Sequence, residues 1–96
     1  MHAVTRFYSG PGAKELFDLL AERKQDVESA MRETHGFVAY TLVATEDGGM
    51  SVTVCNDKAG TDASVKVAKD WVGKNARSLS VSAPQVAEGA ALIALK

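Results

Sequence analysis

The sequence contains little of what would mark a secreted, fibrous or membrane protein. A single cysteine excludes a disulfide within the chain, so a reducing, cytoplasmic location is expected. No apolar run approaches the ~20 residues that a membrane span needs. The first residues lack the basic and apolar regions of a signal peptide. With 46% hydrophobic and 24% charged residues, the composition is that of a globular domain, which excludes disorder, collagen and a coiled-coil rod.

The chain also lacks an excess of charge of one sign. Eleven Lys and Arg stand against twelve Asp and Glu, a net charge of −1, which argues against a nucleic-acid or anionic-membrane partner. The two histidines, His2 and His35, have no further ligands at suitable spacing, so no metal site is expected. No motif points to a cofactor, and none is predicted. The 96 residues are expected to form a single domain, 1–96.

Hydrophobic periodicity predicts six elements in this chain. They are a strand at 2–9, a helix at 13–34, strands at 37–45 and 50–56, a helix at 58–77 and a strand at 86–95. The Asp47-Gly48-Gly49 turn predicts a hairpin between the middle strands, and Asp57 or Thr61 caps the second helix. The order β-α-β-β-α-β predicts an α+β, ferredoxin-like fold: a four-stranded antiparallel sheet with two helices on one face.

Both faces of this sheet are mostly apolar, whereas a solvated face should alternate cleanly to polar residues. We expect the uncharged face, with Thr5, Phe37, Thr41 and Val52, to lie under the helices. The other face is then expected to pack on a second copy of the chain, giving a homodimer. Its candidate interface residues are Arg6, Tyr8, Val38, Tyr40, Leu42, Cys55 and Glu88. Arg6 and Glu88 either pair across neighbouring strands or lie at an exposed edge.

Four residues on the predicted helix side are candidates for a ligand pocket. Trp71 either stacks on a flat ligand or packs in the core. Thr5, Thr41 and Asn56 either orient a carbonyl or phenol in a pocket or satisfy backbone groups at strand ends. Cys55 has no base beside it and is interpreted as a small hydrophobe rather than a nucleophile.

Several segments resemble the dimeric α+β barrel superfamily, in particular its antibiotic-biosynthesis-monooxygenase-like branch. They are Gly10-Pro11-Gly12-Ala13-Lys14, Gly36-Phe37, Asp47-Gly48-Gly49, 54–59 (VCNDKA) and 68–72 (AKDWV). The resemblance implies a homodimer whose sheets close into a barrel, with a ligand cavity between sheet and helices in each subunit. Members include cofactor-free oxygenases, haem-degrading enzymes, isomerases and proteins of unknown function. The haem-degrading members have an Asn on the first strand, where this chain has Thr5, and a His that its second helix lacks.

Two hypotheses for the function follow. In the first, the homodimer binds a small apolar or aromatic ligand and acts as a cofactor-independent monooxygenase or isomerase on an aromatic or carbonyl compound. In the alternative, it is a non-catalytic binding or scaffold dimer with no open active site. A cavity of at least about 300 Å³ beside Trp71 would favour the first hypothesis, and a filled gap the second.

Overall fold

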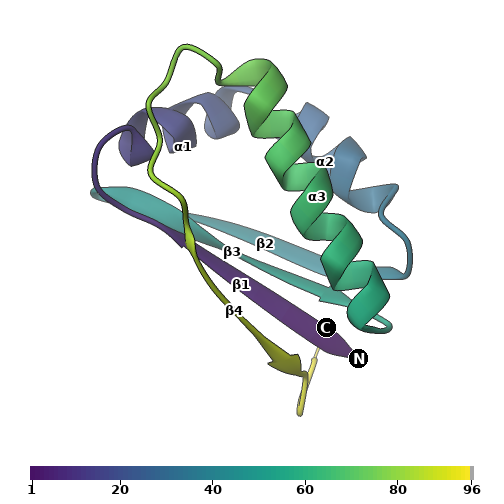
Figure 1. Cartoon of the computed structure of the whole chain (residues 1–96). Coiled ribbons are helices and arrows are strands. Elements are labelled where there is room, and N and C mark those ends of the chain that lie inside the picture. The colour runs from purple at the N-terminus through teal and green to yellow at the C-terminus, as the bar shows by residue number, and fades with distance from the viewer. Residues whose placement is uncertain (96) are drawn as a thin grey trace.

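The computed structural model describes residues 1–95 and confirms the predicted ferredoxin-like α+β fold. The elements in chain order are β1 (His2–Tyr8), α1 (Ala13–Glu22), α2 (Lys24–Arg32), β2 (Phe37–Thr45), β3 (Gly48–Cys55), α3 (Lys58–Asn75) and β4 (Gln85–Ala90). The strands form one antiparallel sheet in the order β2-β3-β1-β4. Within residues 1–95, the three helices cover one face of the sheet and no element covers the other (Figure 1).

The predicted helix over 13–34 is wrong in one respect, because the chain forms two helices there. Arg23, between α1 and α2, has φ −111° and ψ 32°, outside the helical region. Its backbone N–H still bonds to the carbonyls of Leu19 and Leu20, so the break is only one residue wide. The apolar stripe is interrupted here, since no buried residue occurs between Leu20 and Val27. The break lets each helix turn its own apolar side toward the sheet.

Local residues set the starts of α1 and α3 and the position of the hairpin. Gly12 begins α1 with φ +83°, a left-handed conformation that glycine adopts without strain. At α3 the ambiguity is resolved in favour of Asp57, whose Oδ1 accepts a hydrogen bond of 2.9 Å from the Gly60 backbone N–H. The hairpin is tighter than expected: Gly48 pairs with Thr45, so both glycines belong to β3.

A short last strand is the other departure from expectation. β4 ends at Ala90, whereas the prediction extended the strand to residue 95. Residues 91–95 have no regular structure, and Leu92, Ile93 and Leu95 there are more than four-fifths exposed.

The core lies between the helices and the sheet. Its buried cluster is Leu16, Phe17, Leu20, Val27, Met31, Ala68 and Ala76. Tyr8, Tyr40 and Leu42 pack against it from the sheet. The ring of Tyr8 meets that of Phe17 edge to face, with the centroids 5.7 Å apart. No helix within residues 1–95 is long and apolar enough to cross a membrane.

Two glycines of α3 provide a matched test of this packing. A Cβ at Gly60 would lie 2.5 Å from the His35 carbonyl oxygen and 2.6 Å from the Cys55 Cβ, whereas a Cβ at Gly73 meets nothing within 4 Å. We expect Gly60→Ala to lower the free energy of unfolding by about 1–3 kcal/mol through overpacking. Gly73→Ala should raise it by up to about 1 kcal/mol through helix propensity. Urea denaturation measures both, and equal effects would contradict the close approach of α3 to β3.

Candidate functional site

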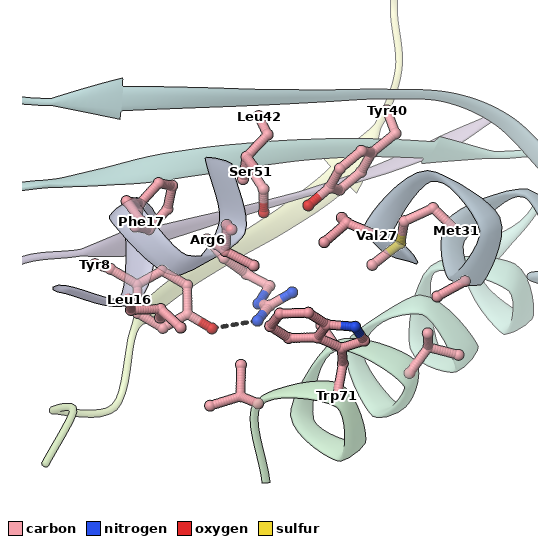
Figure 2. A pocket seen from close by; sticks show the side chains of 15 residues that line it. Arg6, Tyr8, Leu16, Phe17, Val27, Met31, Tyr40, Leu42, Ser51 and Trp71 are labelled. Carbon is pink, nitrogen blue, oxygen red and sulfur yellow. Dashed lines mark hydrogen bonds between the residues drawn. The ribbon is translucent and has the colours of Figure 1, made fainter. Parts of the chain in front are cut away.

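A pocket lies between the sheet and the helices, and we call it the helix-side pocket (Figure 2). The sheet contributes Arg6, Tyr8, Tyr40, Leu42 and Ser51, and the helices contribute mainly Leu16, Phe17, Leu20, Val27, Met31, Ala68 and Trp71. Because β1 and β3 pair with Arg6 opposite Ser51, their side chains enter the pocket side by side. The lining is aromatic and aliphatic except where the sheet supplies polar groups.

The pocket is nearly filled by its own lining side chains. The part of it that water-sized molecules can reach is only about 30 Å³. That reachable part has room for one or two waters. It falls short of the roughly 300 Å³ that a typical small-molecule site offers. A ligand with fused rings therefore requires side chains at the pocket's rim to move aside.

Among the residues that the structure describes, Arg6 is the one charged side chain in the pocket lining. The residue is 5% exposed, and its guanidinium donates a hydrogen bond to the Tyr8 hydroxyl (Figure 2). Its Cζ lies 5.4 Å from the centre of the Tyr8 ring, within reach of a cation–π contact. Tyr8 stands two residues along β1, on the same face, so strand geometry brings the two side chains together.

Two further hydroxyls border this guanidinium. Ser51 is 2% exposed, and its Oγ has no hydrogen-bond partner within residues 1–95. Figure 2 shows the hydroxyl of Tyr40 pointing away from the strand into the same pocket. Burial raises the pKa of the Tyr40 phenol; the positive charge of Arg6 opposes that rise and Tyr8 adds to it. Tyr40 is therefore a protonated hydrogen-bond donor at neutral pH.

Trp71 is half-buried and forms part of the helical wall. The guanidinium of Arg23 lies 5.9 Å from its ring centre, and Arg23 is itself paired with Asp26 at 2.6 Å. The indole thus joins the pocket to the surface at the α1–α2 junction. Of the four residues predicted for the pocket, Trp71 is the one that the structure places in its lining.

The predicted assignment of the two sheet faces is wrong. The face that carries Arg6, Tyr8, Tyr40 and Leu42 lies under the helices, where the uncharged face was expected. Arg6 misled the prediction, because a charged residue on a strand usually marks solvent or an edge. Here its guanidinium finds the oxygen and ring of Tyr8 in the interior. The charge is thus accommodated inside the fold.

The other three pocket candidates lie outside the helix-side pocket. The Thr5 hydroxyl donates to the Ala87 carbonyl at 3.2 Å, across the β1–β4 pair. Thr41 is exposed on the sheet face opposite the helices, in register with Val52. Asn56 is exposed after β3, and its backbone N–H donates to the Gly36 carbonyl at 2.8 Å. The inverted faces account for Thr5 and Thr41.

The candidates for the dimer interface are redistributed by the same correction. Arg6, Tyr8, Tyr40 and Leu42 line the pocket, so they cannot lie on the uncovered sheet face. Val38 occupies a bulge in β2, where the register shifts between Phe37 and Ala39. This extra residue places Phe37 on the same face as Tyr40, against the core.

Cys55 and Glu88 complete that list. Cys55 is fully buried next to Gly60 of α3, and burial raises the pKa of its thiol, as does nearby Asp57. Both facts fit a small hydrophobe. Glu88 does not pair with Arg6: its Oε1 lies 3.0 Å from His2 Nε2 and 3.1 Å from Lys58 Nζ. These partners lower the pKa of the Glu88 carboxyl and tie the edge strand β4 to the start of α3.

The polar group of the pocket was missed as a site. One signal was available, since Arg6 and Tyr8 lie on the same face of a strand with one residue between them, and a hydroxyl is a suitable partner for an arginine. Ser51 could not be predicted as part of the site, because a serine that alternates with valines is typical of the solvent-exposed side of a strand. No group of three or more His, Cys, Asp or Glu that could hold a metal ion occurs in the part of the chain that the structure describes.

No family model and no curated protein matches the sequence, but solved structures match the fold. NE2512, a protein of unknown function from Nitrosomonas europaea, has a TM-score of 0.72 at 19% identity, over 99% of this chain and 91% of that one. SnoaB, a cofactor-independent oxygenase from Streptomyces nogalater, has a TM-score of 0.61 at 20% identity, over 98% of this chain and 94% of that one. The monooxygenase ActVA-Orf6 of Streptomyces coelicolor, solved with nanaomycin D, has a TM-score of 0.61 at 19% identity, over 99% of this chain and 89% of that one.

These likenesses extend over nearly the whole chain and establish its fold. The chain has the ferredoxin-like α+β fold that these structures share, as its sequence pattern predicted. Proteins with this fold include cofactor-independent oxygenases and proteins of unknown function. At these identities the fold alone is shared, so the activity has to be argued from the pocket.

The buried phenol of Tyr40 predicts a pH dependence of stability. Because its pKa is raised in the folded state, the unfolded chain loses this proton first as the pH rises past about 10. The free energy of unfolding should therefore fall in that range, and less steeply in Tyr40→Phe. Urea midpoints at about pH 8 and about pH 11 for both proteins measure this difference. The two proteins differ in this hydroxyl alone, so identical falls would contradict the desolvation of the Tyr40 phenol.

Proposed function

We propose that this protein forms a homodimer and binds a small planar aromatic or carbonyl compound in the helix-side pocket. The observation that supports it best is the set of polar side chains buried in an otherwise apolar pocket. Interiors rarely leave a buried hydroxyl without a partner, as Ser51 Oγ is left here among residues 1–95. A bound ligand with an oxygen at this point would satisfy that hydroxyl, and its rings would lie among Leu16, Met31 and Trp71.

The homodimer is supported by the sheet face that no helix covers, which we call the open face. It consists of Ala3, Thr5, Phe7, Ala39, Thr41, Val43, Met50, Val52 and Val54. Phe7 is 48% exposed and Val43 is 41% exposed, and the face carries no charged side chain among these nine residues. An apolar sheet face of this size is unusual on a monomer. Packing against a second copy related by a two-fold axis would cover the open faces of both subunits.

The dimer can be tested by adding charge to the open face. Val52 lies at its centre, paired with Thr5 on one side and Thr41 on the other. We expect the protein to sediment as a dimer at micromolar concentration and Val52→Asp to sediment as a folded monomer. Ser29→Asp adds the same charge to the exposed surface of α2 and should stay dimeric. A wild-type monomer at that concentration would contradict the assignment of the open face.

The chemistry proposed for the pocket is oxygenation of a substrate that supplies its own electrons to dioxygen, without a cofactor. The helix-side pocket offers hydrogen-bond donors and an apolar enclosure, which would orient such a substrate and exclude water. An isomerase acting on a carbonyl compound would use the same donors. Neither needs a bound metal or an organic cofactor.

A non-catalytic binding or scaffold dimer is the second candidate. The small free volume, about 30 Å³, favours it, because a pocket that stays closed holds no substrate. The two candidates differ in whether side chains at the rim, above all Trp71, move to admit a ligand.

Filling the pocket distinguishes these candidates. Ala30 lines the pocket from α2, whereas Ala21 is exposed on α1 and lies outside it. We expect an anthrone such as dithranol to shift the Trp71 indole resonance and to be oxidised in air above the buffer rate. Ala30→Leu should reduce both by about tenfold or more, and Ala21→Leu should not. Binding without oxygen uptake would indicate a binding protein without oxygenase activity. Absence of binding would support the scaffold dimer.

A further inference from the structure

Arg6 is a buried cation that no carboxylate among residues 1–95 neutralises. Among residues 1–95, the ion pairs involve His2, Lys14, Arg23, Arg32 and Lys58 as cations, and Arg6 takes part in none of them. The lining of the helix-side pocket contains no Asp or Glu. Arg6 is nonetheless buried, with only 5% of the residue exposed. Buried charges in proteins are normally paired, so this one requires an explanation.

The contacts that Arg6 does make leave most of its capacity unused. A guanidinium has five N–H donors. One of them is donated to the Tyr8 hydroxyl, and the Tyr8 ring adds a cation–π contact. Neither partner carries a negative charge. Since the Tyr8 oxygen accepts from Arg6, its own proton remains available to donate.

The neighbours of Arg6 are hydrogen-bond donors too. Ser51 stands opposite Arg6 in the strand register, and its buried Oγ has no partner within the described residues. Tyr40 shares the pocket and keeps its phenolic proton. The polar corner of the pocket therefore combines one positive charge with three hydroxyl donors, and carries no negative charge. Such an arrangement matches an oxygen anion.

We propose that the helix-side pocket binds a planar aromatic carboxylate, with its two oxygens on the Arg6 guanidinium and within reach of Ser51 and Tyr40. A carboxylate matches the guanidinium fork geometrically, and the apolar walls with Trp71 receive the ring. This inference rests on the proposed function, because it names the ligand of the same pocket. It adds that the ligand is negatively charged, a property that the fold alone does not determine.

The test compares two ligands of nearly the same shape that differ in charge. The chain has one tryptophan, so its single indole N–H resonance belongs to Trp71 and reports on the pocket. We expect 2-naphthoate to bind at least about tenfold more tightly than 2-naphthamide, since the charged ligand gains hydrogen bonds to a cation. In Arg6→Met this preference should disappear. Arg32→Met removes the same charge from an exposed site on α2 and should retain the preference.

The stability of the free protein separates a ligand-binding arginine from a structural one. A buried cation without a counterion is replaced by a hydrophobic side chain of similar length at little or no cost. We therefore expect ligand-free Arg6→Met to melt at the same temperature as the wild type or higher. A structural Arg6 would give a lower melting temperature. That result, together with equal binding of the two ligands, would overturn the inference.

The outcomes also keep the two proposals apart. Equal affinities for naphthoate and naphthamide, with the Trp71 resonance shifted by both, would leave the pocket as a ligand site and overturn its preference for an anion. Absence of any shift with either ligand and with the anthrone would overturn both proposals. Retention of the naphthoate preference in Arg6→Met would place the anion elsewhere and overturn the role of Arg6.

Discussion

The burial of one guanidinium between sheet and helices is the feature around which the candidate site of this molecule is built. Arg6 stands on a central strand and faces the helices, where it is held by Tyr8 through a hydrogen bond and a ring contact. Burying a charge is costly, so the residues around it must supply polar partners. Tyr8 supplies one such partner, and the aromatic side chains of this face also pack against the core cluster of Leu16 and Phe17. Core packing and the polar site are therefore built from the same residues.

This arrangement leaves the opposite face of the sheet with small and apolar side chains. Valines 43, 52 and 54 and Phe7 have no cover within residues 1–95, and neither has the apolar segment after β4. A sheet whose two faces are both apolar has to be covered twice, and the helices can cover it only once. The dimer proposed above and the pocket are thus two consequences of one sheet. The pocket uses the face with the longer side chains.

The restricted volume of the pocket has a related cause. Aromatic and long aliphatic side chains line it from both sides, and they pack on each other as side chains do in any interior. The exception is the region around Arg6, Ser51 and Tyr40, because apolar neighbours cannot form hydrogen bonds with their polar atoms. A pocket of this kind is closed by packing and marked by its unsatisfied polar groups.

Much of the fold followed from local sequence: the order of the strands and helical segments, the hairpin between β2 and β3, and the Asp57 cap of α3 are set by contacts within a few residues. The pairing of β2 with β3 was also predictable from residue 39 onward, since Thr41 faces Val52 and Val43 faces Met50 as the alternation requires. Which face the helices cover was not. Alternation groups side chains into two sets but is symmetric between them, and only the packing of Leu16, Phe17 and Trp71 against Tyr8 and Tyr40 decides which set lies inside. The location of Arg6, and with it the candidate site, was a decision of the tertiary structure.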